Sequence, residues 1–196
     1  EGLELTASPA EDPASGVIVT RDGVQHRDGA KVADADVAAS QLDGLLLDAE
    51  AAEQRGNLRE AVLHYSDLLS LKPSHAAAHL GRGRCFVELG DYGSAMSDFH
   101  RAEDLEPGRP EPLLEMGNLF YARKEYTKGI SYYDQALEVS PDFARAWVRR
   151  GLCHQYLRDH QQALSDLQRA AALDPDIPNL RMYIDMARKG LGRSGR

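Results

Sequence analysis

Two histidines one helical turn apart come nearest to a metal-binding pattern in this chain. His75 and His79 form an H-x-x-x-H spacing, which places two imidazoles on one face of a helix, where they could hold zinc. A zinc site needs further ligands, and no third ligand is evident in the sequence. His75 also falls in an expected loop, so we predict no metal site and a packing role for His79.

Catalytic and cofactor-binding patterns are absent from the rest of the sequence. The aspartates near its start lack the spacing and central glycine of a calcium loop and are interpreted as solvated turn residues. There is no G-x-x-x-x-G-K-[ST] phosphate loop, no G-x-S-x-G nucleophile elbow and no paired-cysteine motif. Catalysis needs a nucleophile, an acid or a base held in a pocket. We therefore predict that the protein is not an enzyme and binds no cofactor.

Charge and hydropathy argue against two classes of partner. The net charge of -8 argues against nucleic acid, because proteins that bind phosphate backbones carry a basic surface. No apolar run reaches the roughly 18 residues of a candidate membrane-spanning helix, and no signal peptide is visible. The sequence therefore predicts no nucleic-acid binding, no membrane insertion and a cytoplasmic location.

The elements that must position any functional side chain follow from a repeat of 34 residues. A fixed period of this length indicates a repeat architecture, in which each unit buries its apolar face against its neighbours. Proline ends a helix because the residue before it avoids the α region. Four prolines close the four repeats: Pro73, Pro107, Pro141 and Pro175. The repeats are residues 42–75, 76–109, 110–143 and 144–177.

Small and large side chains recur at fixed positions of these repeats. The eighth and twentieth positions hold only alanine or glycine, which lets the two helices of a hairpin approach closely. The twenty-fourth position holds an aromatic ring in three repeats and a leucine in the fourth, and this side chain fills the space between them. These residues are Ala49, Gly83, Gly117 and Gly151; Ala61, Ala95, Gly129 and Ala163; and Tyr65, Phe99, Tyr133 and Leu167.

Over residues 42–175 this pattern resembles the tetratricopeptide repeat family. The second repeat, with GRGRCFVELGDYGSA, matches best, and Trp147 keeps the family's tryptophan at the fourth position. Lys124 and Arg158 depart from the family, which favours glycine at the turn between the two helices. The resemblance implies an all-α fold, namely a right-handed α-solenoid of helix-turn-helix hairpins.

The start of the chain differs in composition from the repeats. Residues 1–34 are predicted to form a disordered or extended leader, in which Val17–Thr20 is β-prone. A helix is expected to begin near Asp34 or Asp36 and to lead into the repeats, so that the repeat domain covers 35–175.

A capping helix is predicted over 176–191. Pro178 suits a first helical turn, and an apolar stripe with a polar opposite face is what the end of a solenoid needs. Glycines are expected to end the order, which leaves a tail over 192–196. The stripe consists of Leu180, Ile184, Ala187 and Leu191.

The two cysteines are predicted to be buried free thiols. Cys85 and Cys153 lie two repeats apart, and two layers of packed helices separate them by roughly 20 Å. A disulfide requires Cα atoms within about 7 Å of each other. Free thiols favour a reducing compartment.

In the family that this chain resembles, the first helix of each repeat lines a concave groove that binds peptides. The resemblance implies groove positions 2, 5, 6, 9, 12 and 13 of each repeat. Acids dominate them in the first three repeats, whereas Arg145 and Arg149 stand in the fourth. We therefore predict a partner segment with an acidic or C-terminal end near these arginines, and a basic end near Glu50 and Glu53. The candidate groove residues are Glu50, Leu80, Arg84, Leu114, Glu115, Asn118, Tyr121, Arg145, Val148, Arg149 and Tyr156.

Chaperone-tail binders of this family use a two-carboxylate clamp made of Lys, Asn, Asn, Lys and Arg. The matching positions here hold Leu80, Arg84, Glu115, Arg145 and Arg149, of which only the last two agree in charge. A chaperone-type clamp is therefore not predicted, although half an anion site remains.

Three hypotheses of function follow. The first is a non-catalytic interaction module, an adaptor or assembly factor, that binds an extended segment of a partner protein in its groove. The second is a structural subunit of a larger complex, bound through the convex face or the capping helix. The third is the regulatory part of a longer enzyme. The leader is either a plain tail or a segment that occupies its own groove or that of a second copy, which would be self-association.

Overall fold

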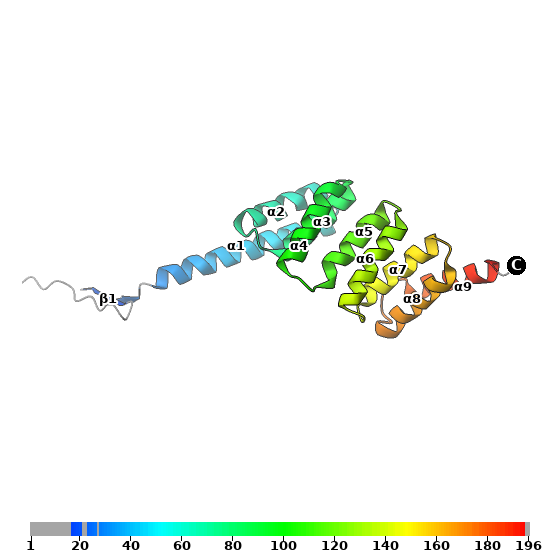
Figure 1. Cartoon of the computed structure of the whole chain (residues 1–196). Coiled ribbons are helices and arrows are strands. Elements are labelled where there is room, and N and C mark those ends of the chain that lie inside the picture. The colour runs from blue at the N-terminus through cyan, green and yellow to red at the C-terminus, as the bar shows by residue number, and fades with distance from the viewer. Residues whose placement is uncertain (1–16, 21–22, 27, 195–196) are drawn as a thin grey trace, which may run out of the picture. The chain divides into compact units, whose positions relative to one another are not determined.

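The computed structural model describes residues 17–20, 23–26 and 28–194 (Figure 1). Two short strands, β1 (Val17–Thr20) and β2 (Gly23–His26), precede the helices. The helices are α1 (Asp28–Gln54), α2 (Leu58–Leu71), α3 (Ala76–Leu89), α4 (Tyr92–Leu105), α5 (Pro110–Ala122), α6 (Tyr126–Val139), α7 (Ala144–Tyr156), α8 (His160–Leu173) and α9 (Leu180–Ser194). The chain divides into two units, Glu1–Leu45 and Leu46–Arg196. Among the described helices, none has both the length and the apolar character of a membrane span.

The first unit contains a β-hairpin. β1 and β2 pair in antiparallel fashion, with Val17 opposite His26 and Thr20 opposite Gly23. The β-prone run is therefore a strand, and its partner strand belongs to the same leader. The predicted disorder of residues 1–16 lies outside the described residues.

Helix α1 begins earlier than the sequence predicts. It starts at Asp28 rather than near Asp34 or Asp36, so residues 28–34 are helical and not disordered or extended. The alanines of this segment explain the difference, because alanine has the highest intrinsic helix propensity.

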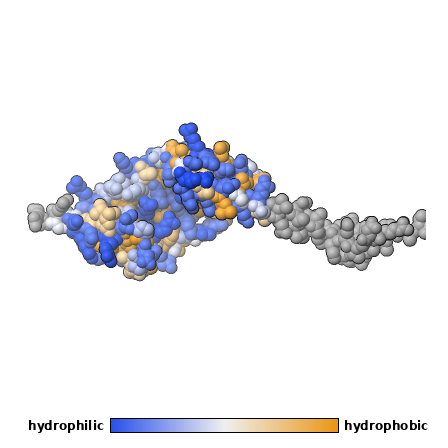
Figure 2. Space-filling view, turned by 180° about the vertical axis from the view of Figure 1, so that it is seen from behind, coloured by the Kyte–Doolittle hydropathy of each residue, from blue (hydrophilic) through white to orange (hydrophobic). Residues whose placement is uncertain are grey.

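In the second unit, helical hairpins follow one another from the end of α1 to α9 (Figure 1). The first helices of neighbouring repeats contact each other, α3 with α5, α5 with α7, and α7 with α9. Neighbours lie closest on the inner side of a curved array, so the first helices line its concave side. The predicted fold class, an all-α right-handed α-solenoid, is confirmed. On the face shown in Figure 2, hydrophilic residues cover most of the surface and hydrophobic ones form small patches.

Close packing inside the hairpins depends on glycines that face aromatic rings. A Cβ atom on Gly83 would lie 2.4 Å from the ring of Phe99, and one on Gly117 would lie 2.4 Å from the ring of Tyr133. Both rings are fully buried. The small residue at position 8 therefore leaves room for the ring at position 24, as predicted.

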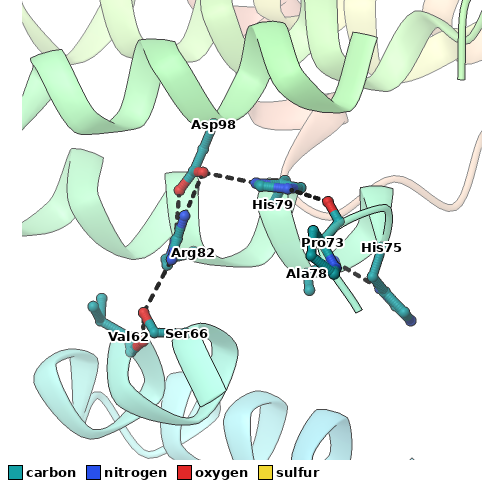
Figure 3. A network of polar contacts seen from close by, with 8 residues as sticks. All are labelled: Val62, Ser66, Pro73, His75, Ala78, His79, Arg82 and Asp98. Atoms are coloured by element: carbon teal, nitrogen blue, oxygen red, sulfur yellow. Dashed lines mark hydrogen bonds and ion pairs between the residues drawn. The ribbon is translucent and has the colours of Figure 1, made fainter. Parts of the chain in front are cut away.

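A polar network ties the second repeat to the first (Figure 3). Arg82 on α3 donates two hydrogen bonds of 2.8 Å to the carboxylate of Asp98 on α4, and one of 3.0 Å to Ser66 Oγ on α2. The Nδ1 atom of His79 lies 2.8 Å from Asp98 Oδ1, and its Nε2 atom lies 3.1 Å from the carbonyl oxygen of Pro73. We name these five residues the α3 latch.

The fourth repeat carries a corresponding network. Arg150 on α7 donates to both oxygens of Asp166 on α8, at 2.8 and 2.7 Å, and to Asp134 on α6 at 2.6 Å. Trp147 Nε1 donates to the carbonyl oxygen of Pro141 at 2.9 Å, and its ring centroid lies 4.6 Å from the guanidinium carbon of Arg150. We name these five residues the α7 latch. Each latch joins both helices of one repeat to the second helix of the preceding repeat.

The two histidines of the H-x-x-x-H spacing have separate roles. His75 caps α3, because its Nδ1 atom accepts a hydrogen bond of 3.1 Å from the backbone N–H of Ala78 (Figure 3). His79 is buried within the α3 latch. Within the described part of the chain, no group of three or more metal-ligating side chains comes together.

The turns inside the hairpins use a left-handed residue. Gly56 and Gly90 take this conformation with φ of 77° and 83°, and Lys124 and Arg158 take it with φ of 60° and 63°. Residues that carry a Cβ atom adopt it at a cost of about 1–2 kcal/mol. The third and fourth repeats therefore keep the geometry of the turn at the expense of some stability.

Helix α9 begins later than the predicted capping helix. It starts at Leu180, so Pro178 precedes the helix instead of lying in its first turn. The predicted apolar stripe does pack inward, because Leu180 and Ala187 are buried in a cluster with residues of α8.

Helix α9 also ends later than predicted. It continues through Gly190 and Gly192 to Ser194, where the sequence predicts a tail. A Cβ atom on Gly190 would lie 2.4 Å from the ring of His160. Close packing against α8 therefore offsets the low helix propensity of glycine.

Cys85 and Cys153 are buried free thiols, as predicted. Burial raises the pKa of each thiol to about 12. Since the thiolate is the reactive form, both side chains act as small hydrophobic residues of the core.

Candidate functional site

A cavity of about 300 Å³ opens between the first helices of three repeats. Side chains of α3, α5 and α7 line it, and most of them are charged or polar. The lining residues are Arg84, Val87 and Glu88 on α3, Glu115, Asn118, Tyr121 and Ala122 on α5, and Arg145 and Arg149 on α7. The cavity thus brings together the predicted groove residues Arg84, Glu115, Asn118, Tyr121, Arg145 and Arg149. We name it the α3–α5–α7 cavity.

Three predicted groove residues turn toward the core instead. Leu114 and Val148 are only 1% and 7% exposed, and Leu80 is half-buried against the cluster that contains Phe99. All three occupy position 5, three residues before the small residue at position 8, so they share its inward face. Their side chains therefore contribute to packing between helices and not to the wall of the cavity.

Two further predicted residues lie outside the cavity. Glu50 is exposed on α1. Tyr156 stacks on Tyr126 with ring centroids 4.8 Å apart, and Tyr121 meets both rings edge-on at 5.7 Å. Because Tyr121 also lines the cavity, this tyrosine cluster holds one part of the cavity wall in place. The sequence reasoning misses Tyr126, because it belongs to a second helix.

Arg84 is engaged within the protein. Its Nε and Nη2 atoms donate hydrogen bonds of 2.9 and 3.2 Å to the two carboxylate oxygens of Glu53 on α1. The hydroxyl of Tyr65 donates a third hydrogen bond, of 2.8 Å, to Glu53. This fixed pair occupies both Arg84 and Glu53, so neither is the first choice of a ligand charge.

Arg145 and Arg149 have no such partner. Among the described residues, neither guanidinium has a carboxylate within ion-pair distance. Arg149 lies over the ring of Tyr121, with its guanidinium carbon 5.8 Å from the ring centroid. Burial raises the pKa of Tyr121, so the ring beside Arg149 stays uncharged. Arg145 is exposed.

A short hydrogen-bond chain holds Glu115 at the middle of the cavity. Asn118 Nδ2 donates to Glu115 Oε2 at 2.9 Å, and the hydroxyl of Tyr133 donates to Asn118 Oδ1 at 3.0 Å. One amide proton of Asn118 remains for a ligand. The sequence reasoning misses this chain, although a signal exists. Position 24 is tyrosine in the first and third repeats, and a buried tyrosine hydroxyl needs a hydrogen-bond partner.

Comparisons with known proteins agree with this architecture. A family model described as tetratricopeptide repeat matches residues 46–110 and 114–178, which is more than half of the chain. A solved structure of a thermophilic TPR protein of Thermus thermophilus has the same fold. Its TM-score is 0.69, with 19% identity, and the match covers 78% of this chain and 84% of that one.

Two curated relatives are similar in sequence. Anaphase-promoting complex subunit 3 of Schizosaccharomyces pombe is 26% identical over 110 residues, which are 56% of this chain and 16% of that protein. Hsp70-Hsp90 organizing protein 3 of Arabidopsis thaliana is 26% identical over 148 residues, covering 67% of this chain and 26% of that protein.

The chain thus spans about a quarter or less of the length of these two relatives. The matched residues contain all the helices that line the α3–α5–α7 cavity. Proteins built from these repeats are protein-interaction modules of a non-catalytic kind. On the match of the family model and the repeat geometry, the chain belongs to the tetratricopeptide repeat family.

Proposed function

We propose that this protein holds an extended segment of a partner protein in the α3–α5–α7 cavity, with a carboxylate of the segment bound by Arg145 and Arg149. One observation carries the proposal. Two arginines line one cavity of about 300 Å³, and neither has an ion-pair partner among the described residues. Guanidinium groups bind carboxylates through paired, charge-assisted hydrogen bonds.

The rest of the cavity supports an extended ligand. The ring of Tyr121 offers an apolar surface, and the remaining amide proton of Asn118 can meet a backbone carbonyl oxygen. A chaperone-type clamp is not favoured, because Glu53 binds Arg84 and a carboxylate, Glu115, takes a position where that clamp uses asparagine.

A capture experiment with charge reversal tests the proposal. The full chain and the variant Arg145→Glu/Arg149→Glu are used as baits in lysate, and captured proteins are compared by mass spectrometry. The matched control is Arg101→Glu/Arg169→Glu, which makes the same charge change at exposed positions of α4 and α8. We expect the partner to be lost with the cavity variant and retained with the control. Retention by the cavity variant would contradict the proposal.

A second candidate function, a structural subunit bound through its last helix, has its own supporting observation. Met182 and Met186 lie one turn apart on α9 and are 50% and 47% exposed, an unusual amount for methionine. A partner that survives both arginine reversals but is lost on Met182→Ser/Met186→Ser would favour this candidate.

A further inference from the structure

The charges that line the α3–α5–α7 cavity are separated by sign. Glu88 on α3 and Glu115 on α5 are acidic, whereas Arg145 and Arg149 on α7 are basic. Among the described residues, none of these four side chains takes part in an ion pair. The remaining charged residue of the wall, Arg84, is bound to Glu53. Two open charges of each sign therefore face one cavity.

Glu115 is the least exposed of the four. Its residue is only 8% exposed, and its one hydrogen bond among the described residues is the contact of Oε2 with Asn118. A carboxylate offers about four acceptor sites, and a buried carboxylate with unused acceptors is costly. The fixed position of Asn118, held by Tyr133, keeps Glu115 from swinging toward Arg149. A cation from a ligand would complete the hydrogen bonding of Glu115.

Resting on the function proposed above, we propose that the cavity selects a segment carrying a basic side chain and a carboxylate together. The basic side chain binds Glu115 and Glu88, and the carboxylate binds Arg145 and Arg149. The basic end of the ligand thus lies at α3 and α5, and not near Glu50 and Glu53, where the sequence alone places it. Glu53 is already neutralised by Arg84.

The same arrangement rejects a purely acidic segment. An acidic side chain that enters between α5 and α7 would come close to the carboxylates of Glu115 and Glu88, and like charges across an interface are unfavourable. A purely basic segment meets Arg145 and Arg149 in the same way. Selection therefore rests on repulsion as well as attraction, which is how closely related ligands are told apart.

Peptide selection tests this inference. Random peptides displayed on phage are panned against the immobilised full chain, the variant Glu88→Gln/Glu115→Gln and the variant Arg145→Gln/Arg149→Gln. Peptides selected by the unmodified chain are expected to carry lysine or arginine at a constant separation from aspartate or glutamate. The glutamine replacements of the glutamates should abolish the preference for the basic residue only. The arginine replacements should abolish the preference for the acidic residue only.

The consensus peptide is then synthesised, and its affinity is measured by fluorescence anisotropy. Each cavity variant should lose on the order of tenfold in affinity, the usual worth of a charged hydrogen bond. Glu138→Gln, an exposed charge on α6, is the control and should bind as the unmodified chain does. Glu88→Gln alone, at an exposed position, should act in the same direction as the double variant and guards against a folding defect at Glu115.

The outcomes separate the two proposals. Selection of acidic peptides without a basic residue, unchanged in the glutamate variant, overturns the inference and leaves the proposed function standing. Failure of the unmodified chain to select any peptide overturns the proposed function, and the inference with it.

Discussion

The α3 latch and the α7 latch solve one packing problem with different side chains. In both, an arginine at position 7 grips an aspartate at position 23, and a ring at position 4 reaches the carbonyl of the preceding proline. In the α7 latch, Arg150 holds two carboxylates and faces an indole ring. In the α3 latch, Asp98 serves two donors, Arg82 and His79.

The difference teaches where each latch is vulnerable. The α7 latch has two acids for one arginine, so it depends on the cation. The α3 latch has two donors for one buried acid, so it depends on the anion. Breaking each latch from either side should therefore give opposite rankings of stability.

The largest effect is expected on removal of the arginines. Arg150→Met leaves Asp166, whose side chain is 3% exposed, with no closer cation than His154 at 4.0 Å. Removing one partner of a buried ion pair costs roughly 3–5 kcal/mol, and we expect about 4. Arg82→Met should cost less, about 2 kcal/mol, because His79 still meets Asp98. Urea unfolding followed by circular dichroism measures both. Equal losses would show that the third partner of each latch has no influence.

Removal of the aspartates should reverse this ranking. Asp98→Ala leaves both Arg82 and His79 without their carboxylate and should cost about 2 kcal/mol. Asp166→Ala leaves Arg150 bound to Asp134 and should cost about 1 kcal/mol. Asp104→Ala, at an exposed position of α4, is the control and should change the free energy of unfolding by less than about 0.5 kcal/mol. A larger loss for Asp166→Ala would refute the comparison.

A smaller effect of either sign is expected at the turns of the same two repeats. The left-handed residue is Gly90 in the second repeat and Arg158 in the fourth. Arg158→Gly should stabilise the protein by about 1 kcal/mol, and Gly90→Arg should destabilise it by a similar amount. Thermal unfolding of the two variants checks both signs. Arg158→Ala is the control, because it removes the side chain but keeps the Cβ atom and should bring no gain.

The smallest difference is expected between the two thiols, which occupy the same position of the two repeats. Burial raises the pKa of Cys85 and of Cys153 to about 12, so alkylation of the folded protein at pH 8 should be slow, and equally slow, at both. A raised pKa stabilises the fold below the ordinary value of 9.0, and this contribution is lost as the pH rises toward 12. Mass spectrometry of iodoacetamide adducts measures the two rates, with the urea-unfolded chain as reference. Fast modification of one cysteine alone would contradict the equivalence.

The sequence predicts the parts of this fold that repeat, because a side chain found at one position four times must meet the same surroundings four times. The spacing of glycine and aromatic residues therefore locates the hairpins and the buried rings. It fails at both ends of the array, where there is no second copy to compare. Helix α1 starts before its predicted residue, and α9 passes through glycines that close packing supports.

The candidate site shows the same division. Charged residues near α7 are found from the sequence, since arginines stand out among acidic groove positions. The inward turn of Leu114 is not found, because position 5 lies on the border between the groove and the core face. The engagement of Arg84 by Glu53 is also missed, since it depends on a side chain from another repeat. Pairing between repeats decides which charges remain open to a ligand.

The alternation of latched and unlatched repeats has an evolutionary consequence. Arg82 and Arg150, Asp98 and Asp166, and Cys85 and Cys153 are each identical pairs 68 residues apart, whereas the first and third repeats have other residues at these positions. Duplication of an ancestral segment two repeats long leaves this signature. The heritable unit of this array is then a latched pair of repeats, and new members of the lineage would gain or lose repeats two at a time.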